Sequence, residues 1–234
     1  TSASLAAVCL GETLTDEASA LGRLRDRLLG ILEDTGCYRL YSELEKPLAN
    51  VLFEMEKAGF SVDTKGLERY SLELGAAADK LSEAVYALAG ERFNINSPKQ
   101  LGVVLFEKLG LKSGKKTKTG YSTDADVLEK LRYDYPVVEL VLQYRALAKL
   151  KSTYADGLRD CVSDRDGRIH TTFRQTLTLT GRLSSVEPNL QNIPVRTELG
   201  RELRRFFLAR EGCVLIDCDY SQIELRVLAD ISGD

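Results

Sequence analysis

Hydrophobic residues recur at steps of three and four between about residues 41 and 154, which is the spacing of helices that bury one face. This pattern predicts helices from Tyr41 to Gly59, from Leu67 to Gly90, from Ser97 to Gly110, from Ser122 to Leu131 and from Pro136 to Tyr154. Glycine ends several of these stripes, and Ser97–Pro98 is typical of an N-cap followed by proline in the first turn. A similar spacing of Leu21, Leu24, Leu28 and Leu32 predicts one further helix near the start of the chain.

The pattern changes near residue 160. Asp164–Gly167 is a turn signal, and the residues after it are rich in Thr, Ile, Phe and Leu, which favour extended chain. Cys213–Asp219 predicts a buried strand, and helical spacing returns from Ser221. The expected fold class is therefore α+β, with a mostly helical domain followed by a part that contains a small antiparallel sheet.

The composition is that of an ordinary soluble globular protein, with 44% hydrophobic residues, 29% charged residues and a net charge of −3. The chain has no overall basic character, so any affinity for phosphate must come from local patches. Five scattered cysteines without a Cys-x-x-Cys pair and a single histidine exclude the usual zinc site and predict free thiols. No apolar run reaches the roughly 20 residues of a membrane span and no signal peptide is recognisable, so we expect a cytoplasmic protein.

The segment Asp217–Arg226 carries the most specific candidate chemistry. At a strand end, Asp217 and Asp219 would share one face, where a carboxylate can bind a hard cation such as Mg²⁺. Spacing alone supports this interpretation no better than the alternative, in which both aspartates lie on a solvated strand end. Ser221 and Glu224 stand three residues apart, as in a capping box, so spacing favours a helix-cap role for the glutamate.

A second candidate is the polar stretch of residues 170–194. Its hydroxyl, amide and guanidinium groups are the donors that contact phosphates, sugars and minor-groove acceptors. A long loop that satisfies its own side chains explains the same residues, and chemistry alone favours that alternative. The lysine-rich stretch 112–120 predicts an exposed loop that either grips a nucleic-acid backbone or merely aids solubility, and the second role is the usual one for a lone lysine run.

Together these segments resemble family A DNA polymerases, the bacterial DNA polymerase I family. Residues 219–226, DYSQIELR, resemble motif A of that family over eight consecutive positions. Residues 180–185 and 188–194 are similar to the palm motif that lines the primer–template duplex, and residues 97–101 and 144–154 resemble thumb helices. The resemblance extends from about Tyr41 to the end of the chain.

This resemblance implies three regions, with 1–40 as the last helix of an upstream exonuclease-like domain, 41–160 as the thumb, and 161–234 as the N-terminal palm before the fingers. It implies a DNA-directed DNA polymerase, a nucleotidyltransferase of DNA replication and repair. Such an enzyme adds deoxynucleotides to a primer 3′-hydroxyl by two-metal transfer with Mg²⁺. The expected partners are primer–template DNA and deoxynucleoside triphosphates, and the full-length protein is expected to be a monomer without a membrane partner.

The resemblance also implies roles for individual residues. Asp219 and the main-chain carbonyl of Tyr220 would ligate the metal, and Glu224 would obstruct a 2′-hydroxyl beneath the incoming sugar. The nucleotide site would comprise Tyr220, Ser221, Gln222 and Glu224. The DNA-binding residues would be Arg182, Asn189, Gln191 and Asn192 in the palm motif, with Lys115, Lys116, Lys118, Lys151 and Ser152 in the thumb. Asp217 matches no ligand position of the family and receives no catalytic role.

The 234 residues lack the fingers helix and the second palm carboxylate that the family uses, so we expect the chain alone to have no polymerase activity. The alternative is a non-catalytic clamp on duplex DNA built on the same scaffold, which would have no need for Asp219 or Glu224. A related RNA polymerase is disfavoured by Glu224, because that enzyme must admit the 2′-hydroxyl.

Overall fold

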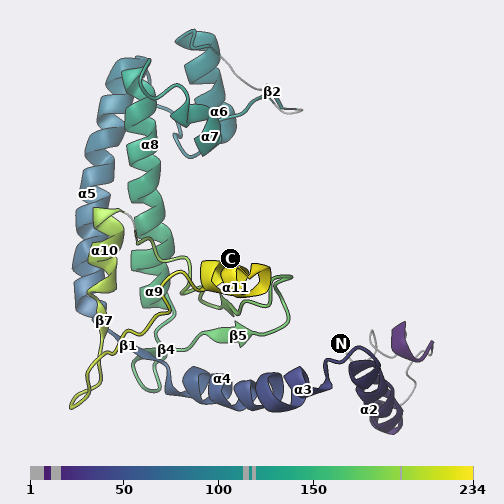
Figure 1. The fold of residues 1–234 in the computed structure, drawn as a ribbon. Coiled ribbons are helices and arrows are strands. Elements are labelled where there is room, and N and C mark those ends of the chain that lie inside the picture. The colour runs from purple at the N-terminus through teal and green to yellow at the C-terminus, as the bar shows by residue number, and fades with distance from the viewer. Residues whose placement is uncertain (1–7, 12–16, 113–115, 118–119, 196, 234) are drawn as a thin grey trace. The chain divides into compact units, whose positions relative to one another are not determined.

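The structure is a computed structural model, and it describes residues 8–11, 17–112, 116–117, 120–195 and 197–233 (Figure 1). The chain divides into two compact units: residues 1–59 with 171–186, and residues 60–170 with 187–234. Helices predominate in both units and the sheets are small and antiparallel, so the α+β prediction is confirmed. The assignment of residues 1–40, 41–160 and 161–234 to named polymerase domains stays a prediction.

The first unit combines helices with a short hairpin. Its elements are α2 (Glu17–Asp34), α3 (Tyr38–Leu40), the π-helix η1 (Tyr41–Glu45), α4 (Lys46–Ala58), β5 (Thr172–Arg174) and β6 (Ser184–Val186). β5 and β6 pair antiparallel, with Phe173 opposite Ser185. Glu56 of α4 accepts a hydrogen bond from the Phe173 backbone N–H at 2.6 Å, and Gln175 Nε2 donates to the Glu45 carboxylate at 3.0 Å. Two glutamates of η1 and α4 therefore attach the hairpin to the helix.

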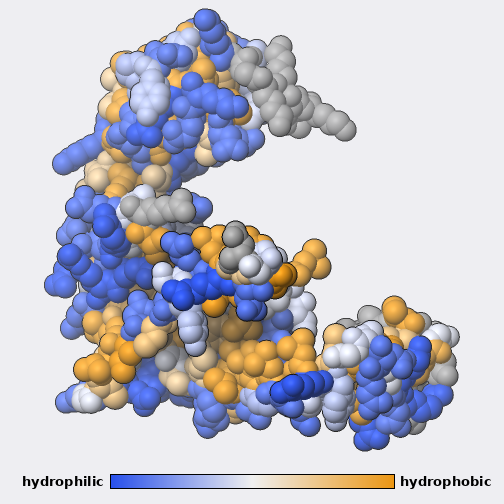
Figure 2. Space-filling view, in the orientation of Figure 1, coloured by the Kyte–Doolittle hydropathy of each residue, from blue (hydrophilic) through white to orange (hydrophobic). Residues whose placement is uncertain are grey.

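The apolar stripe of η1 and α4 predicts the helix correctly but not its burial. The helix ends at Gly59, as the sequence predicts. Leu52 is buried, whereas Leu44, Val51 and Met55 are 56%, 56% and 50% exposed. Figure 2 shows apolar surface along this helix. Periodicity reports the helical repeat, and it does not reveal what covers the apolar face.

The second unit is built on two long helices that lie side by side, α5 (Thr64–Ala89) and α8 (Pro136–Lys149), and α8 continues into the π-helix η3 (Leu150–Asp156) (Figure 1). Its shorter helices are α6 (Pro98–Gly102), the π-helix η2 (Val103–Lys108), α7 (Ala125–Glu129), α9 (Gly157–Asp160), α10 (Glu198–Arg204) and α11 (Ile223–Ser232). Its strands are β1 (Phe60–Val62), β2 (Lys116–Thr117), β3 (Gly120–Tyr121), β4 (Arg168–Ile169) and β7 (Phe207–Leu208). β1 pairs antiparallel with β4 on one side and β7 on the other, and β2 pairs with β3.

Two hydrophobic cores lie at the two ends of α5. One gathers Leu67 and Leu74 of α5 with Leu150 of η3 and Leu203 of α10. The other gathers Val85, near the end of α5, with apolar residues of α6, η2, α7 and α8. The helix boundaries follow the predicted caps, because the Ser97 side chain accepts from the Gln100 N–H and Gly90 ends α5 with a φ of 76°.

Two local predictions are wrong. Cys213–Asp219 forms no strand, and residues 210–233 are exposed throughout. A strand exists only when a neighbouring backbone accepts its hydrogen bonds, and within the described part of the chain no segment pairs with this one. The lysine-rich stretch contains the paired strands β2 and β3 rather than loop alone.

Leu67→Ala should lower the free energy of unfolding by about 2–5 kcal/mol, because this fully buried side chain would leave a cavity in the core beside α10. Leu72→Ala is the matched control on the same helix, since Leu72 is 69% exposed and its truncation should cost little. Denaturant unfolding of both variants measures the difference. Equal losses would show that α5 packs differently from this structure.

Candidate nucleic-acid interface

A polar groove of about 500 Å³ runs between α5 and the α8–η3 helix in the second unit. Its lining comprises Gly75, Ala78, Asp79, Asn96, Tyr144, Arg145, Ala148, Lys149, Lys151, Ser152 and Thr153. Lys149, Ser152 and Thr153 are exposed, and Asn96 Nδ2 donates to the Tyr144 hydroxyl at 3.2 Å. Ammonium, amide and hydroxyl groups are the donors that proteins use on phosphate and sugar oxygens. The groove lining therefore combines an exposed ammonium with neutral donors, a set of the kind that contacts phosphate and sugar without reading sequence.

Arg145, which also lines the groove, forms side-chain hydrogen bonds within the protein. Its guanidinium donates to the Thr123 carbonyl at 2.5 Å and to the Thr123 hydroxyl at 3.3 Å. Burial lowers the pKa of Arg145, and the nearby charge of Asp124 raises it. Ser122 and Thr123 are buried. Arg145 thus fixes the segment that joins β3 to α7, at the foot of the hairpin that begins with Lys116.

The predicted lysine contacts lie at the edge of what the structure describes. Lys116 begins β2, where it pairs with Tyr121 of β3. Lys115 and Lys118 lie outside the described residues. The proposed contacts of these lysines with DNA stay predictions.

Lys151, a predicted DNA contact, takes part in a closed ring of hydrogen bonds with α5. Lys151 Nζ donates to Asp156 Oδ2 at 2.6 Å and to the Ser71 hydroxyl at 3.0 Å, and that hydroxyl donates to Asp156 Oδ1 at 2.6 Å. Ser71 is buried. Burial on its own would raise the pKa of Asp156, but the hydrogen bonds from Lys151 and Ser71 outweigh it and hold that pKa below its usual range.

The palm-like segment 189–193 is attached to the same helix. The Tyr154 hydroxyl of η3 donates to the Asn192 carbonyl, and Ile193 is buried in the core. The side chains of Asn189, Gln191 and Asn192 are exposed. Asn189 Oδ1 also accepts from the Gln191 backbone N–H at 3.0 Å, so the self-satisfied loop of the alternative interpretation is present at this residue. The side-chain amides of Asn189, Gln191 and Asn192 are therefore carried by a backbone segment that hydrogen bonds and the buried Ile193 hold in place.

Arg182 belongs to the first unit. It is exposed in the stretch between β5 and β6, and its carbonyl accepts from the Thr178 hydroxyl at 2.6 Å.

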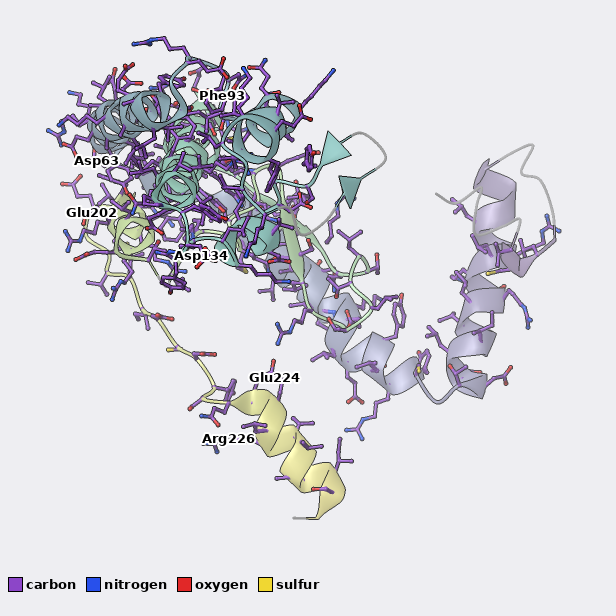
Figure 3. All side chains as sticks on the ribbon, turned by 90° about the horizontal axis from the view of Figure 1, so that it is seen from above. Asp63, Phe93, Asp134, Glu202, Glu224 and Arg226 are labelled. Carbon is purple, nitrogen blue, oxygen red and sulfur yellow. The ribbon has the colours of Figure 1, made fainter. Side chains whose placement is uncertain are left out.

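The segment that resembles motif A, residues 219–226, begins before α11 and continues into its first turn. Asp219 and Tyr220 are exposed, and Figure 3 shows Glu224 and Arg226 on α11. The N-cap residue is Gln222, with a left-handed backbone (φ 51°) and no side-chain capping bond, so Ser221 does not form the predicted capping box. Arg226 Nε instead donates to the Ser221 carbonyl at 2.9 Å.

The oxygen donors in this segment suit a hard cation that takes only some of its ligands from the protein. Among the described residues, no group of three or more His, Cys, Asp or Glu side chains could hold a metal by itself. Mg²⁺ needs no such cage, since it keeps several waters and takes one or two carboxylates with substrate phosphate. The exposed carboxylate of Asp219 and the adjacent Tyr220 carbonyl supply oxygen donors of that kind.

Comparison with known proteins decides the family. Residues 64–234 match the model described as DNA polymerase family A. The chain belongs to this family. Within the family, it is 54% identical to DNA polymerase I of Bacillus subtilis over 226 residues, which cover 96% of this chain and 26% of that protein. It is 52% identical to the thermostable DNA polymerase I of Thermus aquaticus over 231 residues, 96% of this chain and 28% of that protein.

A solved structure agrees over the whole chain. The POL domain of Pol1 from M. smegmatis, in complex with DNA primer–template and dNTP, superposes with a TM-score of 0.90 at 43% identity, over 100% of this chain and 42% of that one. The chain thus spans about a quarter of the length of the curated family A relatives it matches. Among the described residues no helix is long and apolar enough to cross a bilayer.

The sequence did not indicate Lys149, Asn96 and Tyr144, which line the groove, as candidate contacts. The spacing of Arg145 and Lys149, four residues apart on a helix, could have indicated one shared basic face. The partnership of Asn96 with Tyr144 joins positions 48 residues apart, and no local pattern predicts it.

The lowered pKa of Asp156 predicts that the free energy of unfolding falls in acid. A carboxyl group with a lowered pKa in the folded state stabilises the fold above its unfolded-state pKa, and this contribution is lost as the pH falls through the folded-state pKa. Asp156→Asn should therefore flatten the decline in unfolding free energy below about pH 4, and Ser71→Ala, which removes one of the donors, should flatten it partly. Denaturant unfolding at pH 7 and in acid measures this. Parallel pH profiles for the wild type and both variants would contradict it.

Proposed function

We propose that the chain is part of a template-directed DNA polymerase, which extends a primer 3′-hydroxyl with deoxynucleotides. The observation that carries this proposal is the family A match over residues 64–234. It is supported by the likeness over the whole chain to a POL domain in complex with primer–template and dNTP. The expected inactivity of the 234 residues alone and the monomeric state of the full-length protein stay predictions.

The second unit would bind the primer–template duplex through the sugar–phosphate backbone and the minor groove of the DNA. Lys149 and Ser152 would contact phosphates, and Asn189 and Gln191 would donate to minor-groove acceptors, which every base pair offers. Arg182, from the other unit, would make the same kind of minor-groove contact. A polymerase must bind any sequence, so contacts that do not distinguish bases suit it.

The motif A segment would bind the metal and the nucleotide. Asp219 and the Tyr220 carbonyl would hold Mg²⁺, together with a second carboxylate that the resemblance places outside these 234 residues. When bound, the two metal ions of such a site stabilise the attacking and leaving oxygens of an in-line displacement. Ser221, Gln222 and Tyr220 would line the nucleotide site, and the Glu224 side chain would occupy the space that a 2′-hydroxyl needs.

Asp219→Ala in the full-length protein should abolish primer extension, a loss of at least about a thousandfold, because the metal loses a ligand that acts on the reacting oxygens. Primer–template affinity should change little. Asp217→Ala is the matched control, since it removes a carboxylate two residues away that has no assigned role. Extension and gel-shift assays measure both. Normal extension by the Asp219 variant would refute the metal-ligand role of this residue, and a wild-type protein that binds primer–template without extending it would favour the non-catalytic clamp.

Glu224→Ala should raise ribonucleotide incorporation relative to deoxynucleotide incorporation by about tenfold or more, because a steric obstruction to the 2′-hydroxyl is removed. Glu224→Gln preserves the length of the side chain and should keep most of the discrimination. Single-nucleotide extension with matched rNTP and dNTP measures the ratio. An unchanged ratio in the alanine variant would refute the sugar-gate assignment.

A further inference from the structure

The ring formed by Lys151, Asp156 and Ser71 depends on the unusual helix in which two of its members lie. Five residues of an α-helix advance by about 500°, which would point Lys151 and Asp156 about 140° apart. η3 is a π-helix over Leu150–Asp156, and the Gly157 N–H closes it on the Ser152 carbonyl five residues back. Bonding between residues i and i+5 brings side chains five apart onto one face. The π-helix therefore aligns the ammonium and carboxylate that meet at 2.6 Å.

α5 is shaped to receive this pair. Gly75 lies in the middle of the helix, where glycine is usually unfavourable. A Cβ at that position would come within 3.3 Å of Lys151 Cε. The missing side chain leaves the lysine room to cross α5 and reach Ser71 one turn away. The Ser71 hydroxyl then accepts from the lysine and donates to the aspartate, so both charges are bonded to one buried group on α5.

The Lys151 ammonium is consequently bonded to groups of the protein, although its side chain is 38% exposed. Its partner Asp156 is only 25% exposed and also lies 3.8 Å from Arg159. Lys149, two residues earlier, has no such role in the ring and is exposed in the groove. Beyond Lys151, η3 exposes Ser152 to the groove and holds the Asn192 carbonyl through Tyr154.

We propose that Lys151 is a positioning residue for DNA binding rather than a contact to DNA: with Asp156 and Ser71 it fixes the register of η3 on α5. That register sets where Ser152 and the exposed amides of 189–192 are presented to the duplex. This inference deepens the proposed function of the groove and rests on it.

The test is the affinity of the full-length protein for a labelled primer–template over a series of salt concentrations, with Lys151→Gln, Asp156→Asn and the double variant. Both single variants should weaken binding by roughly three- to tenfold, the size of effect of a residue that acts away from the ligand. The double variant should be no weaker than either single one, because one ring is broken in each case. The slope of log affinity against log salt should stay unchanged.

Lys149→Gln serves as the comparison, since loss of one phosphate contact should reduce that slope by about 0.9. Ser71→Ala gives a second break of the ring without any change in charge, and melting temperatures show that each variant is folded. Should one charge variant fail to fold, Ser71→Ala with the remaining variant still decides, because both must weaken binding at constant slope.

The opposite result is equally clear. If Lys151 contacts phosphate, Asp156→Asn releases the lysine and tightens binding, and Lys151→Gln reduces the salt slope as Lys149→Gln does. Either outcome overturns the positioning role, as does unchanged affinity in all ring variants. Failure of the wild-type protein to bind primer–template would instead refute the proposed function, and the inference with it.

Discussion

The packing of α5 along α8 and η3 is the contact on which the rest of the second unit depends. It anchors one hydrophobic core near the start of α5 and a second near its end. The polar groove runs along the same pair of helices. Burial of apolar area supplies the free energy that keeps the helices together, so a polar group such as Arg145 can be held in place without contributing most of the stability itself.

The helices were predictable because their signals are local. Ser97 caps α6, Gly90 and Gly59 end α5 and α4, and the apolar spacing between these points is regular. What the stripe cannot reveal is the partner of its apolar face, as the exposed side chains of α4 show. The spacing of hydrophobic residues also does not distinguish an α-helix from the π-helical turns of η3. The π-helical segment is so short that the two kinds of helix give nearly the same hydrophobic pattern.

In the candidate site, too, local features were predictable from the sequence and long-range contacts were not. The motif A residues were recognisable from eight consecutive positions, yet the strand expected before Asp219 is absent, because a strand needs a neighbour that the described chain does not provide. The groove was harder to predict, because residues as distant as Asn96 and Tyr144 meet only after the helices have packed. Lys151 illustrates the consequence: the family resemblance implied a contact with DNA, and in the structure the ammonium group donates to Ser71 and Asp156.

The π-helical turns of η3 also determine where this part of the chain can tolerate a change of length. A π-helical stretch is equivalent to an α-helix that has gained one residue within a turn. Deletion of a single residue there would restore ordinary winding and leave the residues downstream, among them α9, in their present orientation. The same deletion in α8 would instead rotate everything downstream by about 100° relative to α5, because a regular α-helix has no extra residue to lose. A deletion of one residue is therefore expected to be tolerated in η3 and not in α8.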